Sequence, residues 1–383
     1  MKIVCDQRIP FVEEAFGAFG EISKYDSRAI DNAAVKDADA LLVRSETKVD
    51  EKLLAGSKVK FIGTATIGTD HVDTNFLKNH GIAFASAPGC NSNAVVQYVF
   101  SALFTFAEKN GLKLKGKKIG VVGVGNIGSK IVRVAESLGM EVRQNDPPLA
   151  RSTGDPRYLP LDNLMDADII TIHVPYTKGG TDPTHHLFNA ERLSKLKRGS
   201  IIINSSRGAV VDNQALKAAL RTGTPGFAVL DVWEREPNID TELLSMGAIG
   251  TQHIAGYSID GKVNATKMVY DQFCRYFGFE QSWNANSAIK PPDHPEITIP
   301  QDLVIPEGII SHLVRKCYDI TEDDSLLRKI TDKQETDRGM YFKELRGKYK
   351  FRYEFSNMTA VLSTEDDYLT SVLAALKFRI SFR

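Results

Sequence analysis

The first 110 residues alternate short apolar runs with segments of helical periodicity. Strands that alternate with helices in this way imply parallel βαβ units. The apolar runs predict strands at 1–6, 38–45, 59–68 and 81–88, with helices between them at, for example, 11–19 and 72–79. The segment that follows, near 91–110, includes the most apolar run of the chain, "VVQYVFSALFTFA". It is too short and too polar to span a membrane, so it predicts a buried helix.

A second alternating pattern starts after residue 115. "KKIGVVG" predicts a strand, "GNIGSKIVRVAESLG" a helix and "MEVRQND" a second strand. Later apolar runs predict strands at 167–175, 199–208, 226–233 and 247–256. The chain is therefore expected to contain two α/β units, with the second nested inside the first.

The pattern changes after about residue 284. The segment "NSAIKPPDHPEITIPQDLVIP" has five prolines and no helical period, which is typical of a linker. About ninety residues follow, with a basic stretch at 328–352 and the alternating segment "YKFRYEFSNMTAVLS". Read as a strand, that segment places four aromatic side chains on one face: Tyr349, Phe351, Tyr353 and Phe355.

Composition narrows the function classes. Lys+Arg and Asp+Glu both number 48, so the net charge of +0 argues against a nucleic-acid or membrane-surface partner. The four cysteines form no CxxC pair, and the N-terminus becomes charged by residue 6, unlike a signal peptide. A cytoplasmic protein with a small-molecule substrate is expected.

A glycine-rich turn is the first candidate site. Gly123, Gly125 and Gly128 have the spacing G-x-G-x-x-G between a predicted strand and a predicted helix. In this context the glycines allow a tight turn, close approach of a pyrophosphate and close packing of helix on strand. Asp146 ends the next predicted strand, where a carboxylate accepts hydrogen bonds from a ribose and repels a 2′-phosphate. These residues predict a dinucleotide site that prefers NAD to NADP. Asp146 is also expected to open a turn before Pro147 and Pro148, which does not compete with ribose binding.

Three polar residues follow later predicted strands: Arg207, Glu236 and His253. Ends of parallel strands face the ligand crevice, so the three are expected to act together. Arg207 can bind a carboxylate, His253 can exchange a proton with a hydroxyl, and Glu236 can orient the imidazole. Glu234 is an alternative to Glu236. The alternatives to His253 are His71, His173, His185 and His186, and the adjacent pair 185–186 is not expected to hold a metal.

The motifs "VVGVGNIGSK", "INSSRGAVVD", "DVWEREP" and "QHIAG", in this order, resemble those of the D-2-hydroxyacid dehydrogenases over residues 1–285. The resemblance implies that Arg207 orients the substrate, that Glu236 is the partner of the histidine, and that His253 is the acid–base. It also implies cofactor contacts by the turn residues Gly123, Gly125, Asn126, Ile127 and Gly128.

Four further stretches, "ATIGTDHVD", "PGCNSNAVVQYV", "NDPP" and "HIAGYSIDGK", are similar to one branch of this family, which acts on a phosphorylated 2-hydroxy acid. This similarity implies substrate contacts by Ser45, Thr66 and Tyr257, with Arg44 as an additional candidate. Further cofactor contacts are implied for Asp146, Val174, Asp231 and Gly256. It also implies a C-terminal dimerisation domain and hence a homodimer.

The expected fold is α/β: a Rossmann-type NAD domain (96–254) nested within a flavodoxin-like substrate domain (1–95 and 255–285), followed by a C-terminal α+β dimerisation domain (286–383). The expected activity is NAD-dependent oxidation of a phosphorylated 2-hydroxy acid. Two alternatives stay open. One is another family member, acting on 3-phosphoglycerate or glyoxylate, and the other is a non-enzymatic, NAD-sensing corepressor.

Overall fold

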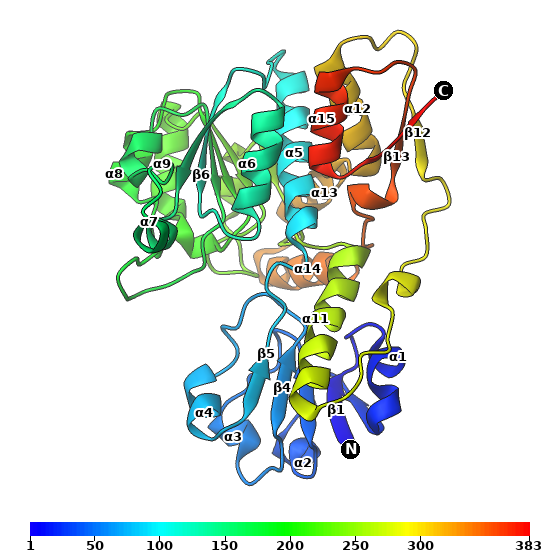
Figure 1. The fold of residues 1–383 in the computed structure, drawn as a ribbon. Helices are drawn as coiled ribbons and strands as arrows, with labels where there is room; N and C mark the ends of the chain where they lie inside the picture. Colours follow the sequence, from blue (N-terminus) through cyan, green and yellow to red (C-terminus); the bar gives the residue numbers. More distant parts are fainter. The chain divides into compact units, whose positions relative to one another are not determined.

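The computed structural model describes residues 1–383, apart from the side chain of Asn286. The chain forms two compact units, each made of two stretches of sequence (Figure 1). Unit 1 comprises Met1–Asn91 and Tyr257–Pro291, and unit 2 comprises Ser92–Gly256 and Pro292–Arg383. The C-terminal stretch thus clusters with the second α/β unit, and the three-domain division made from the sequence stays a prediction.

Unit 1 is built on a five-stranded parallel sheet with the order β2-β1-β3-β4-β5, which is the flavodoxin-like order. Successive residues of its strands enter two different cores: Ile3 and Cys5 point into one, and Val4 points into the other. Both faces of the sheet are therefore covered, which is why inner-strand residues 3–5 and 40–43 are all apolar, whereas the edge strand at 21–25 carries the exposed Glu21 and Lys24. The strands are β1 (Lys2–Asp6), β2 (Glu21–Tyr25), β3 (Ala40–Val43), β4 (Phe61–Thr64) and β5 (Ala83–Ala85).

The helices of unit 1 are short except for α11 (Ile259–Phe277), which belongs to the second stretch of this unit. Tyr270 and Phe273 of α11 pack edge-on against Phe16, with ring centroids 5.7 and 5.2 Å apart. This aromatic cluster joins the two stretches of unit 1 in one core. The other helices are α1 (Val12–Phe16), α2 (Asn32–Val35), α3 (Glu51–Leu54) and α4 (Thr74–Asn79).

Unit 2 contains a six-stranded parallel sheet with the order β11-β10-β9-β8-β6-β7. Strands β7 and β8 lie on opposite sides of β6, so the chain order reverses there. In such sheets ligands bind beyond the carboxyl ends of the strands at the reversal. The strands are β6 (Lys118–Val122), β7 (Glu141–Asn145), β8 (Ile169–Ile172), β9 (Ile201–Asn204), β10 (Phe227–Leu230) and β11 (Ile249–Gly250).

Helix α5 (Ser92–Lys109) is buried along nearly its whole length, as its apolar sequence predicts. Helices α6 and α12 both pack against it (Figure 1). The other helices of this first stretch of unit 2 are α6 (Gly128–Ser137), α7 (Pro147–Thr153), α8 (Ala190–Ser194), α9 (Asn213–Thr222) and α10 (Thr241–Met246).

The C-terminal stretch packs on the Rossmann-type part of unit 2. Leu327, Ile330 and Phe342 enter the same core as Ile170 and Leu230 of the sheet. A three-stranded parallel sheet, β12-β13-β14, completes this stretch. The helices and strands of the C-terminal stretch are β12 (Glu296–Thr298), α12 (Pro306–Cys317), α13 (Ile320–Arg328), α14 (Glu335–Gly347), β13 (Thr359–Leu362), α15 (Asp367–Leu376) and β14 (Arg379–Phe382).

The strand predicted over the alternating aromatic segment is wrong for residues 349–355. Apart from an isolated bridge at Arg352, this segment is irregular, and the strand β13 begins only at Thr359. The burial also differs from the prediction: Arg352 and Glu354 are buried, and of the four aromatic side chains only Phe355 is buried, the other three being half-buried. The reason is that both charged groups have polar partners. Arg352 donates to buried backbone oxygens, described below, and Glu354 accepts a hydrogen bond from the side-chain amide of Asn93 at 3.0 Å. In addition, β12 forms within the stretch predicted as a linker.

No helix among the described residues combines the length and the apolar character that a membrane crossing requires.

Candidate active site

The glycine-rich turn between β6 and α6 has the geometry that its sequence predicts. Gly123 has a φ of +87°, and a Cβ there would lie 2.7 Å from the carbonyl oxygen of His173. A Cβ on Gly128 would lie 1.9 Å from the carbonyl oxygen of Gly123, so only glycine fits either position. At Gly125 a Cβ would meet nothing within 4 Å. The turn is therefore closed on the protein side and open where a pyrophosphate would approach.

The start of α6 is suited to an anion. Gly125 and Asn126 are exposed, and Ile127 is the N-cap residue of the helix. The first amides of a helix have no intrahelical acceptor and carry the positive end of its dipole. The structure thus fits a dinucleotide pyrophosphate at residues 125–128.

Asp146 has two structural tasks. One carboxylate oxygen caps α7 by accepting the amide of Leu149 at 3.0 Å, and the other accepts the amide of Val124 in the glycine-rich turn at 2.8 Å. The expected role of Asp146 in opening this turn is therefore confirmed. Each oxygen still has a second lone pair, so the ribose contact stays a prediction.

The carboxylate of Asp231 organises the loop that carries His253. It accepts hydrogen bonds from the hydroxyl of Thr251 and the amide of Ile254, both at 2.7 Å, and from the amide of Ala255 at 3.0 Å. The amide of His253 donates to the backbone oxygen of Asp231 at 2.8 Å. Asp231 is 1% exposed, so these bonds hold a loop in which His253 has a φ of 60°. A direct cofactor contact by Asp231 stays a prediction, as do those by Val174 and Gly256.

His253 and Glu236 form a hydrogen-bonded pair, with Nδ1 2.8 Å from Oε2. The other carboxylate oxygen of Glu236 accepts the amide of Trp233 at 2.9 Å. Burial raises the pKa of Glu236, but His253, the Trp233 amide and Arg346 outweigh it and lower that pKa below its ordinary value. An ionised Glu236 at Nδ1 leaves Nε2 of His253 available to a substrate hydroxyl.

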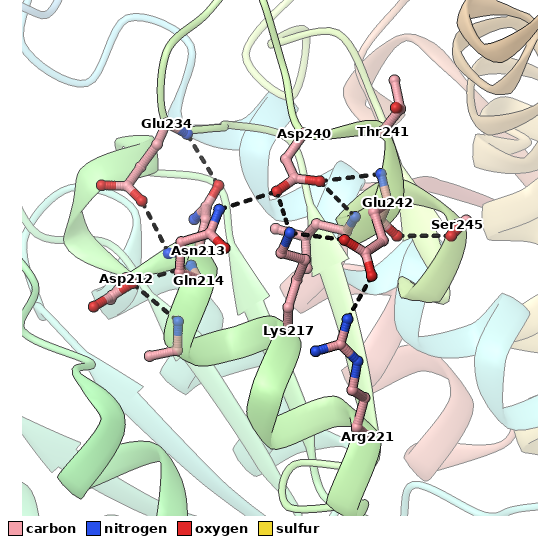
Figure 2. Close-up of polar contacts among 12 residues, drawn as sticks. Asp212, Asn213, Gln214, Lys217, Arg221, Glu234, Asp240, Thr241, Glu242 and Ser245 are labelled. Carbon is pink, nitrogen blue, oxygen red and sulfur yellow. Dashed lines mark hydrogen bonds and ion pairs between the residues drawn. The ribbon is translucent and has the colours of Figure 1, made fainter.

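The segment that carries Glu236 is tied to helix α9 on both sides (Figure 2). Before it, Glu234 and Asn213 exchange two hydrogen bonds of 2.9 and 3.1 Å. After it, Lys217 bridges Asp240 and Glu242 at 2.8 and 2.9 Å. These contacts explain how a loop position can hold a carboxylate in a fixed orientation.

Arg207 follows β9, and its Nη1 donates to the backbone oxygen of Ser206 at 2.8 Å. The side chain of Asn204 fixes this turn by donating to the backbone oxygen of Arg207 at 3.0 Å. A Cβ on Gly208 would lie 2.0 Å from the backbone carbon of Trp233. The loops of Arg207 and Glu236 are therefore in direct backbone contact, and three predicted residues, Arg207, Glu236 and His253, come from neighbouring strand ends of one unit.

The residues considered as alternatives to Glu236 and His253 make other contacts. Glu234 binds Nε2 of His186 at 2.7 Å rather than His253. His173 contacts the hydroxyl of Thr171, and burial lowers its pKa to about 3. His185 contacts Tyr176, and His71, whose pKa is also lowered by burial, contacts Thr64 in unit 1.

His186 lies between two carboxylates that are distant in sequence. The possible ligand atoms of His186, Asp212 and Glu234 lie within 4.8 Å of one another. Both carboxylates also accept backbone amides at the start of α9, since Asp212 caps this helix and Glu234 bonds Asn213. Sequence spacing gave no signal for this cluster, because its members come from three separate loops.

The predicted substrate residues all belong to unit 1. Ser45 is exposed directly after β3, and Tyr257 is half-buried at the start of the second stretch. The Thr66 hydroxyl lies 2.7 Å from that of Thr64 and donates to the Gly68 oxygen at 2.9 Å. Their contacts with a substrate stay a prediction.

Arg352 is a residue that the sequence analysis missed. Its guanidinium donates to the backbone oxygens of Ala94 and Ile254 at 3.0 and 3.2 Å, and also to that of Ala255. It lies over the ring of Tyr318, 4.1 Å from the centroid. The C-terminal stretch thus holds the two residues that follow His253. No sequence signal marked this role, because the alternating pattern drew attention to the aromatic side chains instead.

Comparison with known proteins agrees with this geometry. Residues 97–255 match the family described as D-isomer specific 2-hydroxyacid dehydrogenase, NAD binding domain, so NAD is the cofactor. Residues 289–376 match a family described only as a domain of unknown function. A solved structure of NAD⁺-bound 3-phosphoglycerate dehydrogenase from Entamoeba histolytica is similar, with a TM-score of 0.61 and 26% identity over 74% of this chain and 98% of that one.

Two curated relatives match nearly the whole chain. Erythronate-4-phosphate dehydrogenase of Cronobacter sakazakii is 42% identical over 99% of this chain and 98% of its own length. The protein of the same name from Azotobacter vinelandii is 43% identical over 98% and 99%, respectively. Identity at this level over both α/β units and the C-terminal stretch shows that the chain belongs to the erythronate-4-phosphate dehydrogenases, within the D-2-hydroxyacid dehydrogenase family.

Proposed function

We propose that the protein oxidises 4-phospho-D-erythronate at C2 with NAD, giving 2-oxo-3-hydroxy-4-phosphobutanoate in pyridoxine biosynthesis. The observation that carries this proposal is the His253–Glu236 pair, which lies beyond the strand ends of an NAD-binding unit. The names of the relatives supply the substrate.

His253 accepts the proton of the C2 hydroxyl at Nε2, while the C2 hydrogen leaves with its electron pair. NAD, when bound, is the acceptor of that hydride. Glu236 holds the imidazole through Nδ1 and stabilises the positive charge that forms on it. Arg207 binds the substrate carboxylate and polarises the developing C2 carbonyl.

The turn from Gly123 to Gly128 would hold the pyrophosphate of NAD, and Asp146 would accept hydrogen bonds from its adenine ribose. Asp146 supports a preference for NAD over NADP, because a 2′-phosphate would meet its negative charge. Ser45 and Tyr257 donate hydrogen bonds from their hydroxyl groups to the sugar-acid oxygens. Thr66, whose hydroxyl proton is donated to the Gly68 oxygen, accepts a hydrogen bond from a substrate hydroxyl.

A homodimer is part of this proposal. Unit 2 has a hollow of about 1660 Å³ lined by residues of α5, α12, α13 and α14. Leu112, Ile305 and Leu326 line it and are exposed. Apolar side chains gathered at one surface are typical of a protein interface, and a second copy is the partner that the family resemblance suggests.

A cytoplasmic location is proposed from the reduced, scattered cysteines.

The test is a panel of 2-hydroxy acids incubated with the purified protein and NAD, followed at the absorbance of reduced nicotinamide. We expect 4-phospho-D-erythronate to give the highest kcat/KM. Faster turnover of 3-phosphoglycerate or glyoxylate would show that the proposed substrate is wrong and that the faster compound takes its place. Turnover of none, together with NADH-dependent peptide binding, would favour the corepressor.

A further inference from the structure

Three basic side chains of unit 1 come from segments that converge at one edge of its sheet. Strands β1 and β3 are parallel neighbours, with Cys5 opposite Leu42. Arg8 and Arg44 therefore follow these two strands at the same edge. Both lie just beyond the carboxyl ends of the strands, where open α/β sheets bind ligands.

The third basic residue, Lys262, is brought to this edge by helix α11. The hydroxyl of Thr266 donates to the backbone oxygen of Pro10 at 3.0 Å, which fixes α11 against the loop after β1. Lys262 lies one turn before Thr266 on the same face of the helix. It is thus placed beside the segments that carry Arg8 and Arg44.

The charges at this edge are not balanced. Burial, Arg44 and Arg8 together lower the pKa of Lys262 to about 8, and the attraction of Asp6 only partly opposes them. Arg44 is half-buried, and its guanidinium makes no ion pair or hydrogen bond with any side chain that the structure describes. Arg8 contacts Asp26 and Glu46 only at 3.5 and 3.6 Å, with half of its side chain exposed.

Neutralisation of Asp6 does not explain the three cations. Asp6 is fully buried and already accepts the amide of Arg8 at 2.8 Å and the hydroxyl of Ser27 at 2.5 Å. At Lys262, moreover, the repulsion from Arg44 and that from Arg8 each exceed the attraction of Asp6. Lys262 also occupies the first turn of a 19-residue helix, where the dipole disfavours a cation. The site therefore has an excess of positive charge that an anion would relieve.

We propose that Lys262, Arg44 and Arg8 form a binding site for a phosphomonoester dianion, and that this site receives the phosphate of the substrate. The second half of this proposal rests on the proposed function. Two or three cations match the charge of a phosphate, and both arginines can bind it through two N–H groups.

The test uses the full chain and two matched variants on helix α11. Lys262→Met removes the proposed contact, whereas Lys267→Met removes a lysine that pairs with Asp271 on the same helix. Inorganic phosphate is the probe, as an inhibitor competitive with 4-phospho-D-erythronate. We expect Lys262→Met to weaken phosphate inhibition by about 10- to 100-fold, the range of a charge-assisted hydrogen bond, and Lys267→Met to change it less than twofold. Equal inhibition of wild type and Lys262→Met would overturn the site.

A second readout separates this site from the proposed function. Phosphate should raise the melting temperature of wild type and Lys267→Met in the absence of substrate, but not that of Lys262→Met. If this pattern holds while no 4-phospho-D-erythronate is oxidised, the anion site stands and the substrate assignment fails. If 4-phospho-D-erythronate is oxidised but phosphate raises the melting temperature of none or of all three proteins, the site fails and the function stands.

Misfolding cannot imitate the expected result. Lys262→Met removes a partly buried charge repelled by two arginines, so without phosphate at pH 7 its melting temperature should equal or exceed that of wild type. Arg44→Gln provides a second variant, for which KM should rise more for 4-phospho-D-erythronate than for erythronate. An equal rise for both substrates would remove Arg44 from the site.

Discussion

At the scale of single residues, the proton-transfer group depends on few contacts. His253 is held by two residues of the neighbouring loop after β10: Asp231 binds its backbone amide and Glu236 binds its imidazole. We expect His253→Ala to lower kcat by about 10²- to 10⁴-fold, since this is the usual contribution of general acid–base catalysis. Binding of NAD, measured by fluorescence titration, should change little. Near-normal turnover would move the role to another base, with His71 the first to be examined.

Glu236 gives a prediction about pH. Its pKa in the folded protein lies below the ordinary value of 4.5 because His253 and the Trp233 amide outweigh burial. A carboxylate with a lowered pKa adds stability above its unfolded pKa, and that stability is lost as pH falls through the folded pKa. Glu236→Gln should therefore reduce the free energy of unfolding by about 1–3 kcal/mol at pH 7.

The measurement is urea unfolding of both proteins between pH 3 and pH 7. The difference between them should shrink at the acid end, where wild type also loses the ionised form. In the same variant kcat should also fall, because the imidazolium that forms during the reaction loses the carboxylate that stabilises it. A difference in stability that is constant with pH would show that the pair is not ionic.

The residue scale is also where the sequence was most and least informative. Arg207, Glu236 and His253 could be predicted because polar residues at the ends of apolar runs stand out. The tasks of Asp231 and Arg352 could not, because each binds backbone atoms of residues that have no pattern of their own. Contacts to backbone depend on the three-dimensional path of the chain and leave no trace in side-chain identity.

At the scale of elements, the parallel strands were predictable and the C-terminal segments were not. An apolar run such as Ile201–Asn204 has one plausible place in an α/β sheet. The segment 349–355 alternates like a strand, but its buried charge at Arg352 is satisfied by carbonyls of α5 and of the His253 loop. Tertiary hydrogen bonds outweigh the local preference of the alternating aromatic residues.

Arg352 carries the prediction at this scale. Arg352→Met should leave the buried oxygens of Ile254 and Ala255 without their donor, at a cost of about 1–3 kcal/mol each. Because the loop of His253 would loosen, kcat should fall, by up to about 100-fold, while NAD affinity should stay within a few-fold. Arg379→Met, at an exposed position of β14, is the matched control. An unchanged kcat in Arg352→Met would show that this residue contributes to stability alone and does not position the loop of His253.

At the scale of the whole molecule, the C-terminal stretch does more than the sequence analysis assumed. A chain that ended near Trp283 would lack this stretch. The shared core of Leu327, Ile330 and Phe342 with the sheet, and the bonds of Arg352, make unit 2 incomplete without this stretch. A shortened chain would therefore lose both its folding and its association, and the two effects could not be separated. Surface substitutions in the full chain are the better test of the dimer.

The proposed dimer can be tested in the full chain. The double variant Ile305→Asp and Leu326→Asp places charges on exposed apolar positions of the hollow in unit 2. We expect wild type to sediment as a dimer and this variant as a monomer at micromolar concentration. Tyr276→Asp, at an exposed aromatic position of unit 1, should remain dimeric. A monomeric wild type would refute the dimer.

The lysine at the edge of the unit 1 sheet has a consequence for the proton balance of a catalytic cycle. With a pKa of about 8, Lys262 is about half protonated at pH 8 before an anion arrives. A bound phosphate favours the charged amine, so binding should take up as much as about half a proton per site, whereas the oxidation itself releases one. In weakly buffered solution at pH 8, an indicator dye in a stopped-flow instrument should report a brief rise in pH before the steady fall. At pH 6 the amine is already charged, so the rise should vanish, and Lys262→Met should lack it at both pH values.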